Sequence, residues 1–204
     1  MTHAVPLLFN GVMTLRTKNR ILLVSGPPGS GKTTLARPLA ERLGFALLTK
    51  DDIKETLFTT LDGAPGDLEF SRRIGAAAME LLWALAPHCP QVLLEANFRT
   101  QSEHERGKIT ALIAQGAQIV EICCRIPREE ASRRFAERAR HERHHPAHML
   151  AEMLPERMAE YEQPFGLSPL IEVDTLNPVD IEALAGRVES LLVSIAAKGC
   201  STIS

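Results

Sequence analysis

One eight-residue segment constrains this sequence more than any other. Residues 26–33 read Gly-Pro-Pro-Gly-Ser-Gly-Lys-Thr and fit the pattern G-x-x-x-x-G-K-[ST] in full. An apolar, β-branched run at residues 21–24 precedes the segment, and apolar residues at helical spacing follow it from residue 32 to residue 43. We therefore predict a buried strand, a glycine-rich loop and a helix in succession, with Gly44 ending the helix as its C-cap.

Such a strand–loop–helix unit, a P-loop, binds the phosphates of a nucleoside triphosphate. Its glycines let successive backbone N–H groups curl around phosphate oxygens, and the positive end of the helix dipole faces the same anion. We expect Lys32 to reach the β- and γ-phosphates of ATP and the Thr33 hydroxyl to bind Mg²⁺. An ordinary glycine-rich turn is the alternative, and it is disfavoured because strand, loop, lysine, hydroxyl and helix all agree. The predicted nucleotide-binding residues are Gly26, Pro27, Pro28, Gly29, Ser30, Gly31, Lys32, Thr33 and Thr34.

Strand and helix patterns alternate along the rest of the chain. Further strands are predicted at residues 45–48, 91–95, 118–124 and 170–173, and further helices at 52–61, 68–86, 102–115, 127–140 and 179–197. Ser102 is expected to cap the helix that it begins. Because right-handed crossovers join parallel strands, this order predicts an α/β fold with a parallel sheet covered on both faces.

Length and composition narrow the class of protein. At 204 residues the chain fits one compact domain, which we place at residues 20–204 behind a loose N-terminal extension at 1–19. The net charge of −2 gives no overall basic field for nucleic acid, and no segment reaches the ~20 apolar residues that span a bilayer. Four cysteines without CxxC spacing, together with no secretory signal, indicate a cytoplasmic protein.

A P-loop alone does not separate a kinase from a GTPase switch or a motor ATPase. No Asn-Lys-x-Asp guanine box occurs, and the chain is short for the extra helical domain of most motor ATPases. A kinase needs an acid beside the acceptor hydroxyl, and Asp51 and Asp52 follow the second predicted strand. Because ligands gather beyond the carboxyl ends of parallel strands, a carboxylate there can accept the acceptor's proton. We expect one of the two aspartates to cap the next helix while the other acts on the acceptor.

A second acid ends the third predicted strand. Glu95 follows an apolar run, the usual place for a carboxylate that holds Mg²⁺ through water; a solvated strand-end carboxylate is the alternative. Asn97 and Arg99 follow in the adjoining loop and are expected on the acceptor side with Asp51 and Asp52.

Arginines follow the fourth predicted strand. Arg134 and Arg138 are four residues apart, so they project from one face of their helix. Guanidinium groups on a closing lid, which we place at about residues 128–160, can neutralise the transferring phosphoryl group and exclude water. An ion-paired surface is the alternative, since glutamates interleave with the arginines. A flexible lid or an acceptor-contacting loop suits the following histidines better than a zinc site does: His141, His144, His145 and His148.

These residues together resemble those of the small P-loop kinases. The match runs from the phosphate loop through Lys50-Asp51-Asp52-Ile53 and Glu95-Ala96-Asn97-Phe98 to Arg134 and Arg138, and covers about residues 21–175. Within that family the chain looks most like the branch of 5′-hydroxyl polynucleotide kinases, zeta-toxin-like proteins and AAA family ATPases. The resemblance implies a five-stranded parallel sheet, Asp51 as general base, Arg138 as lid arginine and residues 174–178 near the adenine. Glu95 stands where that family usually has an aspartate.

The sequence thus predicts a P-loop NTPase fold, three-layer αβα with a five-stranded parallel sheet and a helical lid. The expected activity is an ATP- and Mg²⁺-dependent transfer of phosphate to a hydroxyl, with Asp51 orienting or deprotonating the acceptor and Arg138 with Arg134 closing over it. A small-molecule acceptor is favoured over a nucleic-acid end because only 4% of the residues are aromatic. A 5′-hydroxyl polynucleotide kinase and a non-enzymatic ATP-binding module remain alternatives.

Overall fold

The structure, a computed structural model, describes residues 19–141, 145–150 and 158–200, and the side chains among them up to residue 197. Five strands form one parallel sheet in the order β2-β3-β1-β4-β5, which confirms the predicted sheet. The strands are β1 (Arg20–Ser25), β2 (Ala46–Thr49), β3 (Gln91–Glu95), β4 (Gln118–Arg125) and β5 (Leu170–Asp174). The predicted N-terminal extension lies outside the described residues, apart from its last member, Asn19.

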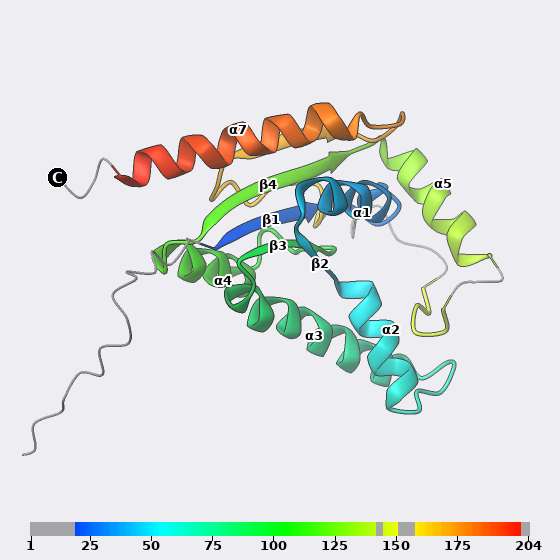
Figure 1. Ribbon diagram of the computed structural model, residues 1–204. Coiled ribbons are helices and arrows are strands. Elements are labelled where there is room, and N and C mark those ends of the chain that lie inside the picture. The colour runs from blue at the N-terminus through cyan, green and yellow to red at the C-terminus, as the bar shows by residue number, and fades with distance from the viewer. Residues whose placement is uncertain (1–18, 142–144, 151–157, 201–204) are drawn as a thin grey trace, which may run out of the picture.

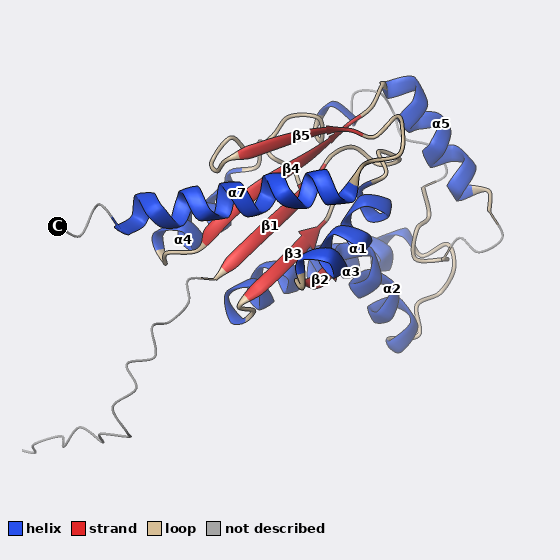
Figure 2. Cartoon of the chain, turned by 45° about the horizontal axis from the view of Figure 1, so that its top comes forward, coloured by secondary structure: helices blue, strands red, loops and turns tan. Residues whose placement is uncertain are grey.

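The helices cover both faces of this sheet. They are α1 (Lys32–Leu43), α2 (Lys50–Thr60), α3 (Leu68–Leu85), α4 (Glu103–Ala114), α5 (Arg128–Ala139) and α7 (Ile181–Cys200), with a short 3₁₀ turn, η1 (Ala86–His88). In Figure 1, α7 lies on one side of the sheet and α3 and α4 lie on the other, and Figure 2 shows the strands side by side between these layers. The predicted three-layer α/β arrangement is confirmed.

The side chains of β1 point alternately to the two faces of the sheet, and both faces are covered by helices. Leu22 and Val24 pack into the core formed with α1 and α7, whereas Ile21 and Leu23 pack into the core formed with α3 and α4. All four side chains are fully buried. Because its side chains alternate between the two faces, the central strand contributes to both cores. Burial of each such side chain stabilises the fold by about 1.5–3 kcal/mol.

The register of the sheet brings three strand ends together. Glu95 of β3 lies level with Val24 of β1 and with Thr49 of β2. The segments that follow these strands therefore leave the sheet at one edge, where crevices for ligands form in parallel α/β sheets. This edge carries the phosphate loop and the Asp51 segment.

The helix ends show where local patterns predicted the capping residues and where they did not. Gly44 ends α1 in the left-handed conformation, at φ 68°, as predicted. The prediction that Asp51 or Asp52 caps α2 is wrong, because α2 begins directly where β2 ends and the Thr49 side chain accepts the Asp52 N–H at 3.0 Å. Ser102 occupies the N-cap position of α4, but its hydroxyl makes no capping hydrogen bond.

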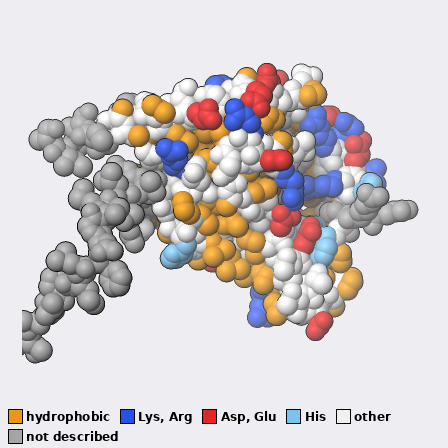
Figure 3. Space-filling model, in the orientation of Figure 1, with side chains coloured by type: hydrophobic (Ala, Val, Ile, Leu, Met, Phe, Trp, Pro, Cys, Tyr) orange, Lys and Arg blue, Asp and Glu red, His pale blue; other side chains and the backbone are white. Residues whose placement is uncertain are grey.

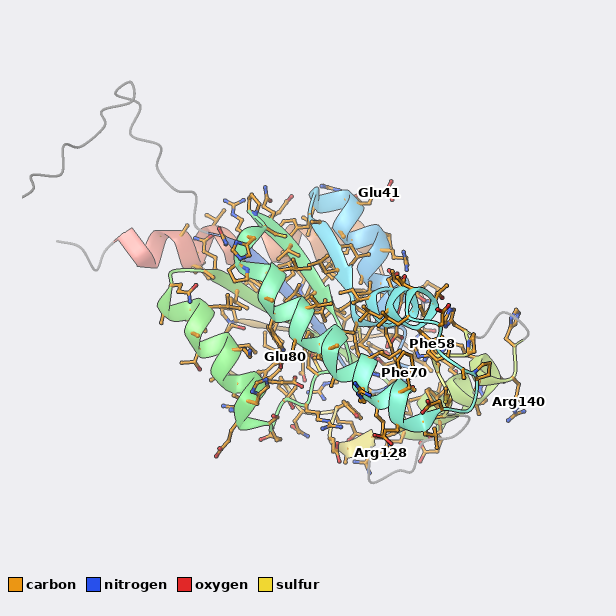
Figure 4. All side chains as sticks on the ribbon, turned by 90° about the horizontal axis from the view of Figure 1, so that it is seen from below. Glu41, Phe58, Phe70, Glu80, Arg128 and Arg140 are labelled. Carbon is orange, nitrogen blue, oxygen red and sulfur yellow. The ribbon has the colours of Figure 1, made fainter. Side chains whose placement is uncertain are left out.

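A small third core lies where α2 and α3 extend past the sheet. Phe58 of α2 packs with Ile74 of α3 and with Ala147. Figure 4 shows Phe58 and Phe70 on these neighbouring helices, with ring centroids 5.9 Å apart. Within the described residues, no helix combines the length and apolar character needed to cross a membrane.

Candidate phosphate-binding and transfer site

The phosphate loop is held tightly between β4 and α5. A Cβ atom on Gly26, at φ 137°, would lie 2.8 Å from the carbonyl oxygen of Cys124. A Cβ on Gly29, at φ 81°, would lie 2.2 Å from the carbonyl oxygen of Ala131 on α5. Only glycine fits these two close backbone approaches, so the loop's shape depends on tertiary contacts as well as on its own turns.

Lys32 lies inside the loop. Its side chain is 6% exposed, and its Nζ donates hydrogen bonds to the carbonyl oxygens of Gly26 and Pro27, each at 2.9 Å. Burial lowers the pKa of Lys32, whereas the negative charges of Glu95 and Asp51 oppose that shift. The ammonium's hydrogen-bond partners among the described residues are neutral carbonyls, so an anion in the loop would supply the countercharge that they lack.

A buried polar group without a hydrogen-bond partner among the described residues lies in the same loop. The Ser30 hydroxyl is fully buried and has no hydrogen-bond partner within the described part of the chain. Buried polar groups normally have partners, and exceptions gather where a ligand supplies one. The loop therefore fits a phosphate group on two independent grounds, its buried ammonium and this hydroxyl.

Thr33 and Glu95 bring two oxygen donors together. The Thr33 hydroxyl donates to a Glu95 carboxylate oxygen at 3.1 Å, and Glu95 is 4% exposed. Burial raises the pKa of Glu95, and the charge of Lys32 opposes this shift. A hydroxyl and a carboxylate are hard oxygen ligands, so this donor set fits Mg²⁺ better than a softer metal.

Asp51 and Arg138 complete a charged cluster from four elements. The charges of Asp51, Glu95 and Arg138 all act on the pKa of Lys32, so α1, α2, β3 and α5 each bring a charged group near it. Burial alone would raise the pKa of Asp51, but the positive charges of His148 and of three cationic side chains outweigh burial and hold that pKa below its usual value. Asp51 is therefore a stable carboxylate at neutral pH.

Arg134 and Arg138 have different neighbours although they lie four residues apart on α5. The Arg134 guanidinium donates to Glu130 at 2.7 Å and to the backbone carbonyls of Thr175 and Leu176, each at 3.0 Å. Arg134 therefore ties α5 to the segment that follows β5. Arg138 instead lies 5.7 Å from the ring centroid of Phe135 and close enough to affect the pKa of Asp51.

The remaining acceptor-side candidates lie farther out. Asp52 accepts two hydrogen bonds from Arg37 at 3.0 Å on the surface, so it faces α1 and leaves Asp51 as the carboxylate inside the cluster. Arg99 is 67% exposed, 3.9 Å from Glu160. Asn97 is partly buried in the loop after β3.

Sequence patterns did not indicate Glu105 as part of this region. This buried carboxylate accepts the Arg99 backbone N–H at 3.0 Å and thereby fixes the loop after β3. Burial raises the pKa of Glu105. Glu105 lies in the first turn of α4, where acidic residues are common because they interact favourably with the helix dipole. Its sequence position therefore gives no signal of a role in the loop after β3.

A cavity of about 520 Å³ opens beside the phosphate loop. Its lining includes Pro27 of the loop, Arg125 at the end of β4, Arg128 at the start of α5, and Asp174 and Leu176 after β5. The last two belong to the segment that the family resemblance placed near the adenine. In Figure 3, charged side chains of both signs gather where the visible face is hollowed near α5.

The fold and the phosphate loop together define a kinase-like P-loop protein that binds nucleotide. More narrowly, the chain belongs to the AAA domain family, whose model matches residues 21–164.

The chain is similar to several individual proteins. The crystal structure of a candidate kinase from Chloroflexus aurantiacus is similar to this protein, with a TM-score of 0.74 and 29% sequence identity. The match covers 86% of this chain and 98% of that chain. The cytidylate kinase of Ignicoccus hospitalis is 27% identical over 124 residues, which is 58% of this chain and 64% of that protein. Uncharacterized proteins of Mycobacterium tuberculosis are 42% identical over 52 residues, or 24% of this chain, and are far longer, so that the match spans 10% of their length.

Proposed function

We propose that this protein is an ATP- and Mg²⁺-dependent phosphotransferase that moves the γ-phosphate to a hydroxyl group of a small molecule. The observation that carries the proposal is the position of Asp51, a half-buried carboxylate with a lowered pKa near the cations Lys32 and Arg138. A nucleotide-binding module without transfer activity would need no such carboxylate facing its phosphate loop.

Each group has a chemical role in this proposal. Asp51 orients the acceptor hydroxyl, whose oxygen attacks the γ-phosphorus in line while the bond to the β–γ bridging oxygen breaks. The hydroxyl's proton passes to Asp51 and then to solvent, and because the pKa of Asp51 is low, that proton leaves late in the step. Lys32 and Arg138 stabilise the negative charge that spreads over the transferring group.

The metal would be held at Thr33 and Glu95, where it would supply charge neutralisation at the phosphates. The cavity beside Pro27 and Leu176 is the proposed place of the adenine, and Arg134 keeps its far wall in position through the carbonyls of Thr175 and Leu176. A reducing cytoplasm suits the three free cysteines of the described region: Cys89, Cys123 and Cys124.

A small acceptor is proposed over a nucleic-acid end for two reasons. The chain has a net charge of −2, and stacking aromatic side chains are scarce, with one Trp and one Tyr. The likeness to a cytidylate kinase makes a phosphate acceptor the second candidate, because such an enzyme transfers to cytidylate.

The test is transfer from γ-labelled ATP to a panel of sugars, nucleosides, aminoglycosides, cytidylate and 5′-hydroxyl oligonucleotides. We expect Asp51→Asn to lower transfer about 10²- to 10⁴-fold, the usual contribution of a general base, with the affinity for ATP unchanged. Asp52→Asn is the matched control, since it changes the adjacent carboxylate, which pairs with Arg37 on the surface, and it should retain transfer. Wild-type transfer by the Asp51 variant would contradict the assignment, and labelling of cytidylate alone would replace the hydroxyl acceptor by a phosphate.

A further inference from the structure

The segment at residues 145–150, here called the arm, packs against α2 and α3. Ala147 is fully buried with Phe58 and Ile74. The His145 ring stands edge-on to Phe58, with centroids 5.8 Å apart, and its Nε2 lies 3.4 Å from the Thr59 hydroxyl. The arm is therefore docked on the helix that carries Asp51.

A buried lysine anchors the arm. Lys54 of α2, 9% exposed, donates from Nζ to the carbonyl oxygen of Ala147 at 2.8 Å and to the Ser71 hydroxyl of α3 at 2.9 Å. Ser71 donates to the same Ala147 carbonyl at 2.8 Å. The lysine stem passes close to Gly75 of α3, where an added Cβ would lie at an ordinary contact distance of 3.6 Å from the Lys54 Cε. One backbone carbonyl of the arm thus receives two donors from two helices.

The arm carries His148 to the face of α2 that holds Asp51. The Nε2 of His148 lies 2.9 Å from a Glu55 carboxylate oxygen, and its side chain is 21% exposed. Asp51 and Glu55 are four residues apart on α2, so they share one helix face. A histidine bonded to Glu55 therefore lies beside Asp51.

Charged and titratable groups of the described residues surround His148. They include Asp51, Lys54 and Glu55 from α2, and His145 from the arm itself, with ring centroids 6.5 Å apart. Burial lowers the pKa of His148, and the negative charge of Asp51 opposes that shift. In turn, a positive charge on His148 is the largest of the charges that lower the pKa of Asp51.

We propose that the arm, anchored through Lys54 and Ser71, makes His148 a positioning residue for Asp51. The imidazole fills the space beside the carboxylate and fixes its direction toward the acceptor, so transfer depends on a docked arm. This inference rests on the proposed phosphotransferase function, but the placement of His148 can be tested without it.

The placement is tested on the full-length protein by NMR titration of the His148 ring. We expect Asp51→Asn to lower the pKa of His148 further, because a negative charge beside the ring is lost. Lys54→Met should move that pKa up toward its ordinary value of 6.5 and speed amide exchange across residues 145–150, because the arm loses its anchor. Identical His148 titrations in the wild type and both variants would overturn the proposal.

The consequence for catalysis is tested with any acceptor that the transfer panel identifies. We expect His148→Gln to lower kcat up to about 100-fold with the KM for ATP unchanged, the loss typical of a misplaced catalytic group. The acid limb of its pH profile should move to higher pH, because protonated His148 no longer lowers the pKa of Asp51. His104→Gln is the matched control, since His104 pairs with Glu80 at 2.6 Å on another surface, and it should behave as wild type.

A wild-type pH profile and kcat in His148→Gln would overturn the positioning role. Calorimetry separates the two proposals: absence of ATP binding would defeat the phosphotransferase function, whereas the His148 titrations would still decide whether the arm places this ring beside Asp51.

Discussion

The contact between Gly29 and α5 can be tested by adding a single methyl group. In Gly29→Ala the new Cβ would lie 2.2 Å from the Ala131 carbonyl oxygen and 3.1 Å from the Phe135 backbone nitrogen. Real Cβ atoms essentially never come within 3.0 Å of such atoms, so the loop and α5 must separate by about 0.8 Å. Both opposing atoms belong to a helix backbone and cannot move aside as a flexible side chain could.

Two costs add in this variant. Holding an alanine at a left-handed φ costs roughly 1–2 kcal/mol, and forcing a methyl group into a packed contact costs typically about 1–3 kcal/mol. We therefore expect the unfolding free energy to fall by about 2–5 kcal/mol. Gly116→Ala is the matched control: its φ is 89°, and nothing lies within 4 Å of the added Cβ, so only the backbone cost of roughly 1–2 kcal/mol applies.

Urea denaturation of the two variants measures the difference, and calorimetry with ATP and Mg²⁺ measures the effect on binding. Since the loop must shift to relieve the contact, we expect Gly29→Ala also to bind ATP more weakly, whereas Gly116→Ala should bind as wild type. Equal destabilisation by the two substitutions, with unchanged ATP affinity, would show that α5 does not press on the loop and would refute the reasoning.

Three further predictions concern ionisable groups whose pKa the fold shifts. Burial raises the pKa of Glu95, so its ionised form destabilises the fold, and we expect Glu95→Gln to have a higher thermal midpoint at pH 7. The same variant should show weaker Mg²⁺-dependent ATP binding. A lower midpoint in a thermal scan would contradict the first expectation. Asp51 has a lowered pKa, so its charge stabilises the fold at neutral pH. The difference in unfolding free energy between wild type and Asp51→Asn should therefore shrink as pH falls below about 4, which urea titrations from pH 3 to 7 would check. Lys54 has a pKa of about 8 in the fold against 10.5 in the unfolded chain, so the unfolded state binds more protons between these values. Wild-type stability should consequently rise relative to Lys54→Met from pH 8 to 10, and a constant difference would exclude the buried ammonium.

Several features could be read from the sequence because they depend on neighbouring residues. The glycine pattern at residues 26–31, with Lys32 and Thr33 after it, specifies a loop whose chemistry lies in consecutive backbone groups. Apolar patterns located every strand of the sheet within a few residues. The three central strands, β1, β3 and β4, are buried on both faces and therefore read as nearly continuous apolar runs. The parallel orientation of the strands then followed from the alternation of strands and helices.

Other features depended on tertiary packing. Asp51 and Asp52 are adjacent and chemically identical, yet one lies in the charged cluster and the other pairs with Arg37 at the surface. Successive helical residues point in different directions, and only the packing of α2 on α3 and the sheet decides which direction faces the phosphate loop. The same holds for Arg134 and Arg138, whose neighbours come from different parts of the chain.

The sequence alone therefore determined the phosphate loop, the order of elements and the set of charged residues from which a transfer site can be built. Tertiary structure alone decided which of these residues meet. The anchor of the arm illustrates the reason: Lys54 and Ser71 lie 17 residues apart, and Lys54 and Ala147 lie 93 apart, so no local pattern relates them. Hydrogen bonds and burial act between atoms that are close in space, and closeness across such separations exists only once the chain has folded.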